Sequence, residues 1–150
     1  MKILFVGSYL SRKRGSHSIA EKVYEGLKNR FQISLVSKQN NKLLRLLDII
    51  VKTIFFRGDV AVIDVFSDKA FFLAYISSKI LSKKNKKIIL VLHGGKLADF
   101  HQVNERYVES VLGRGNLILS PSKFLIKHFS KVGFEIRHLP NPVDLKNFKQ

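Results

Sequence analysis

Residues 7–17 contain three consecutive cations followed by Gly15 and Ser16. Glycine allows the backbone to approach a ligand closely, and the free N–H groups at the start of a helix attract anions. We therefore predict that Arg14, Gly15 and Ser16 contact a phosphate group. The alternative interpretation is a long exposed loop with ordinary helix capping.

The segment His93-Gly94-Gly95 follows a continuous apolar run and carries the second candidate chemistry. An imidazole can hydrogen-bond a sugar hydroxyl or an oxyanion, and its charge state is adjustable near neutral pH. The two glycines allow a ligand to approach the backbone. His93 is therefore the candidate catalytic residue. The alternative is a turn that requires glycine and carries an incidental histidine.

Several other reaction classes are disfavoured. The chain has no cysteine, which excludes disulfides, thiolate zinc sites and cysteine nucleophiles. The first loop matches neither G-x-G-x-x-G nor a Walker loop, so a nicotinamide dehydrogenase or a P-loop NTPase is disfavoured. Asp64 and Asp68 lie near the end of one predicted strand without an evident partner, which argues against a hydrolase. No metal site is predicted, because no metal-ligand spacing links the histidines His101, His128 and His138.

Apolar runs and helix-like periodicities alternate along the chain. Strands are predicted at residues 3–6, 33–36, 60–66, 88–92, 117–119 and 135–139. Helices are predicted from the Ser18–Glu21 capping box, at 42–56, 69–81 and 103–112, and from Ser120-Pro121 to near Gly133. This alternation predicts an α/β fold, a Rossmann-like doubly wound parallel sheet of about six strands with helices on both faces. Ligands of such sheets bind at the carboxyl ends of the strands, where both candidate segments lie.

The bulk properties restrict the partners. The chain has 150 residues, a hydrophobic fraction of 45% and a formal net charge of +16. The length fits one domain with a substantial core, and no segment has the roughly 18–20 continuous apolar residues of a membrane-spanning helix. A strongly positive surface attracts polyanions, namely nucleic acid, anionic lipid or phosphorylated small molecules. The absence of cysteine fits a cytoplasmic location.

Sequence motifs also occur in a recognisable order. They are Met1–Val6, Glu25-Gly26-Leu27, Leu92–Gly95, Leu119–Leu125 followed by Phe129 and Gly133, and Leu139–Asp144 followed by Phe148. This series resembles the N-terminal half of a GT-B glycosyltransferase and spans nearly the whole chain. It most resembles the large retaining family, family four, which uses nucleotide sugars to build bacterial surface polysaccharides.

The resemblance implies a role for each candidate residue. Arg14, Gly15 and Ser16 would contact the donor diphosphate. His93 would face the reacting sugar or the acceptor. The wall beside the acceptor would be formed by Gly94, Gly95 and Lys96.

The resemblance also implies a domain organisation. Residues 1–139 would be the acceptor-side Rossmann-like domain, and residues 140–150 the start of an interdomain linker. The family's C-terminal domain, which carries the nucleotide pocket, would be absent, so we expect no turnover from residues 1–150 alone. The nucleotide sugar would bind through that domain as a substrate, with no cofactor and no metal. The hinge between the two domains would comprise Pro140, Asn141, Pro142 and Asp144.

The acceptor implied by the family is a lipid-linked glycan, which places the protein in the cytoplasm or at the inner face of the cell membrane. Basic residues close to an anionic membrane each contribute about 1 kcal/mol to binding. The helix predicted at 42–56 could lie in the headgroup plane, and the alternative is a helix that simply packs on the sheet. The predicted membrane or anion patch comprises Arg12, Lys13, Arg45, Lys52 and Arg57.

Two other functions remain open at this point. A basic α/β module that binds nucleic acid would use the same net charge and would show a steep salt dependence. Because most phenylalanines occupy core-like positions and so cannot stack on bases, no nucleic-acid partner is expected. A non-catalytic subunit of a split, two-chain glycosyltransferase would instead co-purify with a second chain.

Overall fold

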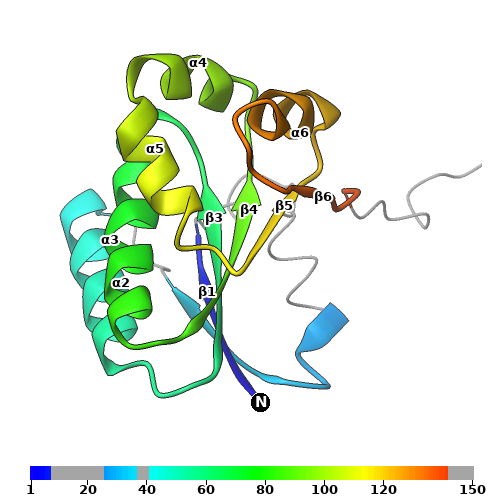
Figure 1. Ribbon diagram of the computed structural model, residues 1–150. Helices are drawn as coiled ribbons and strands as arrows, with labels where there is room; N and C mark the ends of the chain where they lie inside the picture. Colours follow the sequence, from blue (N-terminus) through cyan, green and yellow to red (C-terminus); the bar gives the residue numbers. More distant parts are fainter. Residues whose placement is uncertain (8–25, 37–40, 142–150) are drawn as a thin grey trace, which may run out of the picture.

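A computed structural model describes residues 1–7, 26–36 and 41–141 (Figure 1). Their strands form one parallel sheet in the order β2-β1-β3-β4-β5-β6. The predicted α/β fold with a Rossmann-like parallel sheet of about six strands is therefore confirmed. The strands are β1 (Lys2–Val6), β2 (Gln32–Val36), β3 (Val60–Val65), β4 (Lys87–Leu92), β5 (Leu117–Ser120) and β6 (Arg137–His138).

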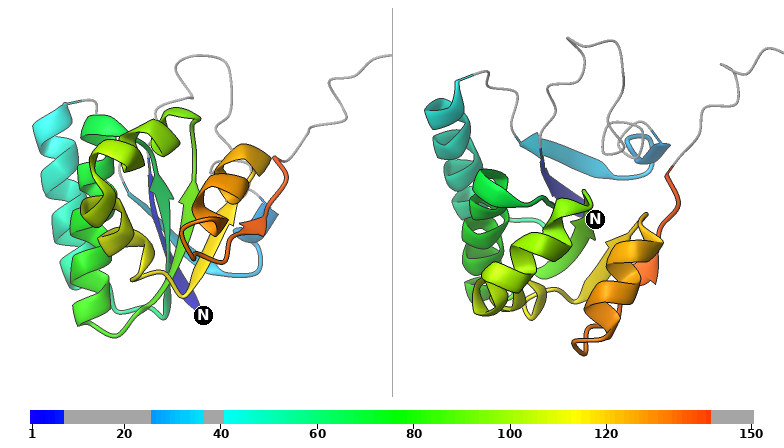
Figure 2. Two further views of the ribbon diagram at one scale, coloured as in Figure 1. Left: turned by 45° about the horizontal axis from the view of Figure 1, so that its top comes forward. Right: turned by 90° about the horizontal axis from the view of Figure 1, so that it is seen from above.

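The helices that connect β2 through β6 lie together on one face of the sheet, as the view from above shows (Figure 2). Each of these connections moves across the sheet in the same direction. Right-handed crossovers that move in one direction place their helices on the same face. These helices are α2 (Lys42–Phe55), α3 (Phe71–Lys83), α4 (Lys96–Val103), α5 (Glu105–Leu112) and α6 (Lys123–Ser130).

The core follows from the alternation of side chains along the strands. Leu4 and Val6 of β1 belong to the large cluster beneath the helices, whereas Ile3 and Phe5 belong to a smaller cluster that includes Leu27. Successive residues of a strand point to opposite faces, so the two clusters lie on the two sides of the sheet. The last three residues of β4 are all buried, as expected of a central parallel strand.

Three local features differ from the predictions. The helix predicted at 103–112 is α5, but the helix before it, α4, was not predicted, and Asn104, with φ −128° and ψ 43°, separates the two. The N-cap of α6 is Ser122, whose Oγ accepts from the Leu125 N–H at 3.3 Å, and not Ser120. The sixth strand is shorter than predicted: Arg137 and His138 pair with β5 and the Leu139 N–H donates to the Ser120 carbonyl at 3.0 Å, so residues 135 and 136 lie outside the ladder.

Among the described residues, no helix has the length and apolar character needed to cross a bilayer. The Ser18–Glu21 capping box lies outside the described residues.

Candidate functional site

Two neighbouring strands end beside each other at the carboxyl edge of the sheet. Asp64 is the penultimate residue of β3, and His93 directly follows β4. The two strands are in register, with Val65 opposite Leu92, and the His93 N–H donates to the Val65 carbonyl at 2.9 Å. The backbone ladder therefore fixes where the His93 side chain begins.

The side chains of His93 and Asp64 form a hydrogen-bonded pair, the Asp64–His93 dyad. His93 Nε2 lies 3.0 Å from Asp64 Oδ1, and each side chain is only 10% exposed. An ionised carboxylate can only accept, so the proton resides on Nε2. In the neutral ring, Nδ1 is then the nitrogen free to accept a proton or a hydroxyl hydrogen bond.

The imidazole of His93 is also supported from the side. The Phe66 ring stacks on it with a centroid separation of 4.9 Å and an interplanar angle of 18°. Phe66 is 38% exposed, so the stacked pair lies at the surface of this edge. A carboxylate on one nitrogen and an aromatic ring against the face together fix the orientation of the imidazole.

A third strand contributes to the site through Gly7, directly after β1. A Cβ atom at Gly7 would lie 2.3 Å from Asp64 Oδ2 and 3.1 Å from Asp64 Cγ. The Gly7 N–H donates to the Val36 carbonyl at 3.0 Å, so the backbone there is held in place. The Asp64 carboxylate therefore occupies space that only glycine leaves open.

The predicted wall residues follow His93 directly. Gly94 has φ +80°, a conformation that other residues rarely adopt, while Gly95 has φ −61° and is the N-cap residue directly before α4. A Cβ atom at either glycine would meet nothing within 4 Å, and Lys96 is exposed. The surface beside His93 is therefore open.

The end of β5 is tied to the end of β4. Ser120 Oγ donates to the Leu92 carbonyl at 3.1 Å and accepts from the Ser122 N–H at 3.2 Å. This buried hydroxyl joins two strands instead of capping α6, which is why the predicted cap was wrong. The bond holds the start of α6 beside the residue that precedes His93.

A pair of histidines, His101 and His128, joins α4 to α6. His101 Nδ1 lies 3.0 Å from His128 Nε2, and His101 Nε2 lies 3.5 Å from Glu109 Oε1. Burial lowers the pKa of His128, and His101 and Lys131 lower it further, while Asp99 opposes them. Both helices begin next to the carboxyl edge, so this pair helps to fix their relative positions.

The other sequence-predicted residues are not all placed. Arg12, Lys13, Arg14, Gly15 and Ser16 lie outside the described residues, as do the hinge residues Pro142 and Asp144. Pro140 and Asn141 are exposed and outside any helix or strand. The remaining patch residues are together on or just after α2, namely Arg45, Lys52 and Arg57.

Sequence reasoning missed Asp64 as a partner of His93, and it missed Gly7. The expectation that Asp64 lacks a partner was wrong because the two residues are 29 positions apart and meet only when β3 pairs with β4. Asp68 does not join them, since it is exposed and accepts from Ser67 Oγ at 2.9 Å. The available signal was the position of Asp64 and His93 at the ends of consecutive parallel strands.

Two surface cavities lie at the opposite, amino edge of the sheet. The one of about 270 Å³ is lined by Leu117 and Gly133, among others, and the one of about 350 Å³ by Lys87 and Arg114, among others. Neither includes the Asp64–His93 dyad. Within the described ranges, no group of three or more histidine or acidic side chains could hold a metal ion.

The arrangement at the carboxyl edge is thus an oriented imidazole with a fixed proton, beside an open, glycine-rich backbone. No family model, curated protein or solved structure matches the chain.

Proposed function

We propose that residues 1–139 form the acceptor-side domain of a glycosyltransferase with a GT-B architecture. The observation that carries the proposal is the Asp64–His93 dyad at the carboxyl edge of a Rossmann-like parallel sheet, directly before Gly94-Gly95. Ligands of open α/β sheets bind at this edge. The motif order described above supports the retaining, family-four type.

In this proposal His93 contacts the reacting sugar or the acceptor, and Asp64 positions it. Asp64 keeps the proton on Nε2, which leaves Nδ1 to accept a hydrogen bond from a sugar hydroxyl. Gly94 and Gly95 carry no side chain that would exclude a sugar from the edge. A second domain supplies the nucleotide pocket, so the donor reaches His93 only when both domains are present.

In this proposal the donor and the acceptor bind mainly to different domains. The donor is a nucleotide sugar bound mainly by the second domain, and the acceptor is a lipid-linked glycan at the inner face of the membrane. The net charge of +16 favours an acceptor that carries a diphosphate. The reaction is transfer of a hexose-type sugar in surface-polysaccharide synthesis.

The test is sugar transfer by the protein that unites this domain with a nucleotide-sugar domain, in one chain or with a co-purified second chain. Radiolabelled nucleotide sugars are offered with a lipid extract, and wild type is compared with His93→Ala. We expect a loss of about 100-fold or more, the usual contribution of a positioned acid or base. His138→Ala, an exposed histidine on β6, serves as the matched control. Near wild-type transfer by His93→Ala would remove the assignment.

A further inference from the structure

Helix α2 exposes an unusual number of large apolar side chains. Phe55 is 73% exposed and Leu43 is 72% exposed, and four neighbours are between 47% and 57% exposed. At 100° per residue, all six fall within an arc of roughly 120° around the helix. This α2 apolar face consists of Leu43, Leu44, Leu47, Val51, Ile54 and Phe55.

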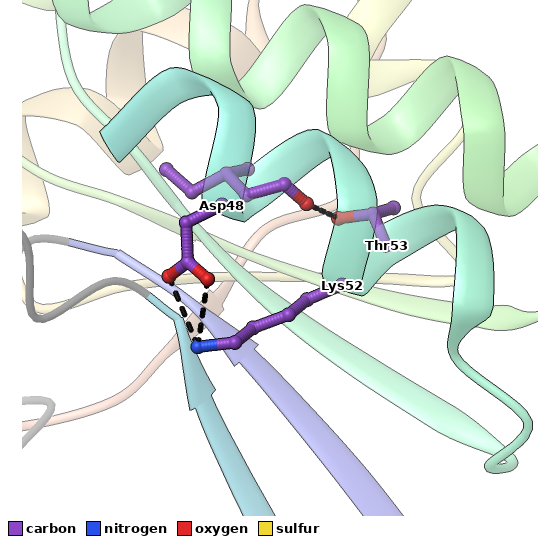
Figure 3. A network of polar contacts seen from close by, with 4 residues as sticks. Asp48, Lys52 and Thr53 are labelled. Atoms are coloured by element: carbon purple, nitrogen blue, oxygen red, sulfur yellow. Dashed lines mark hydrogen bonds and ion pairs between the residues drawn. The ribbon is translucent and has the colours of Figure 1, made fainter. Parts of the chain in front are cut away.

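Helix α2 packs on the rest of the protein through other residues, not through the α2 apolar face. Ile49 and Thr53 are fully buried, and Thr53 Oγ1 donates to the Ile49 carbonyl at 2.6 Å (Figure 3). On a third side, Lys52 Nζ lies 2.9 Å from Asp48 Oδ1 in an ion pair. The helix therefore has a buried side, a charged side and an exposed apolar side.

The position of α2 explains why the face stays uncovered by the described residues. α2 is the outermost helix of its layer and packs against α3 on one side only (Figure 1). Lys84, the residue directly after α3, donates to the carbonyl oxygens of Ile54 and Phe56, which fixes the C-terminal end of α2. Exposed apolar patches of this extent, bordered by charged residues, mark interaction surfaces.

The charges around α2 indicate which kind of partner binds the α2 apolar face. Residues 42–57 contain four cations, Lys42, Arg45, Lys52 and Arg57, against one acid, Asp48. A second copy of the chain would bring two molecules of net charge +16 together, which is unfavourable. Nucleic acid would satisfy the charge but would offer no large apolar surface to this face. An anionic lipid bilayer supplies both negative headgroups and a hydrocarbon boundary.

We propose that the α2 apolar face inserts into the headgroup region of an anionic bilayer. The helix axis lies in the plane of the membrane, and the apolar arc enters the boundary between headgroups and acyl chains. The sequence left two alternatives for this helix, packing on the sheet or lying in the headgroup plane, and the structure shows a buried side that packs and a separate apolar side that is exposed. The proposal rests on the exposure and charge of α2 and holds whether or not the domain transfers sugar.

The chain contains no tryptophan, so a single introduced one reports its own surroundings. Leu47→Trp places the probe in the α2 apolar face. Val103→Trp is the matched control, because Val103 is 83% exposed on α4. Each variant of the 150-residue chain is mixed with vesicles of phosphatidylcholine containing phosphatidylglycerol, with brominated lipid as a quencher.

We expect Leu47→Trp to shift to the blue and to be quenched, while Val103→Trp changes little. Vesicles of phosphatidylcholine alone, or about 0.5 M salt, weaken the response, because screening shortens the reach of the charges. No response of Leu47→Trp, or an equal response of Val103→Trp, overturns the proposal. So does a blue shift without lipid that grows with protein concentration, since a second copy would then cover the face.

A set of variants tests how much the α2 apolar face contributes to the free energy of membrane binding. Leu43→Ser, Leu47→Ser and Phe55→Ser together should lower the vesicle partition coefficient by about tenfold or more. Val103→Ser with Phe124→Ser removes exposed apolar side chains from α4 and α6 and should bind like wild type. Urea unfolding confirms that each variant is folded. An unchanged partition coefficient in the folded triple variant contradicts the proposal.

Discussion

Replacing Gly7 by alanine is expected to break the Asp64–His93 dyad without touching either residue. The new Cβ atom would lie 2.3 Å from Asp64 Oδ2, whereas ordinary contact begins near 3.4 Å. The carboxylate must therefore move by roughly 1 Å, and a 3.0 Å hydrogen bond does not survive such a displacement. Losing this largely buried bond should cost about 1–3 kcal/mol in the free energy of unfolding.

A double-mutant cycle isolates the cause. In an Asp64→Ala background, the nearest remaining atom of residue 64 is Cβ, at 3.4 Å from the new methyl group, which is an ordinary contact. Gly7→Ala should then be neutral or stabilise by up to about 1 kcal/mol, because alanine restricts the unfolded chain. Urea unfolding of the four proteins measures the coupling energy. Gly26→Ala, with nothing within 4 Å, is the control. An equal cost of Gly7→Ala in both backgrounds would refute the reasoning.

Gly94→Ala should destabilise by about 1–2 kcal/mol, because Gly94 has φ +80°, whereas Gly95→Ala, at φ −61°, should stay within about 0.5 kcal/mol in urea unfolding. Equal effects would show that the left-handed backbone is not required. The lowered pKa of His128 means that the unfolded chain binds more protons below the ordinary histidine pKa of about 6.5. Stability should therefore be fully present above that pH and decline as the pH falls through the folded-state pKa of His128. His128→Asn should flatten this decline between about pH 7 and pH 5 in urea titrations, and an unchanged slope would contradict the assignment.

The parallel sheet could be predicted because the sequence patterns that indicate it each lie within a short stretch of the chain. Apolar runs such as residues 88–92 and the alternation of strands with helices indicate the fold without any knowledge of contacts. Helix α4 was not predicted, because its buried residues are Leu97, Ala98 and His101, which form a weak apolar pattern in the sequence. A hydroxyl such as Ser120 could cap a helix or bridge two strands, and the tertiary position of Leu92 decides between them.

The candidate site was predictable in its position but not in its composition. His93 followed by Gly94-Gly95 indicates a functional edge, since the segment ends a buried strand. Asp64 could not be assigned, because its partnership depends on the register of β3 with β4. The role of Gly7 depends in turn on where the Asp64 carboxylate lies. The α2 apolar face was likewise hidden, because the sequence shows a wide apolar side but not how little of it the sheet covers.

The most direct test of the proposed function is a titration of the chain, labelled with ¹⁵N in its histidines and backbone, with a short-chain prenyl-diphosphate sugar. We predict that the His93 ring nitrogens and the Gly94 and Gly95 amides shift together, while His138 does not. A DNA duplex at the same salt concentration should leave the His93 ring unchanged. If the DNA shifts these signals and the sugar diphosphate does not, the acceptor-side assignment is contradicted.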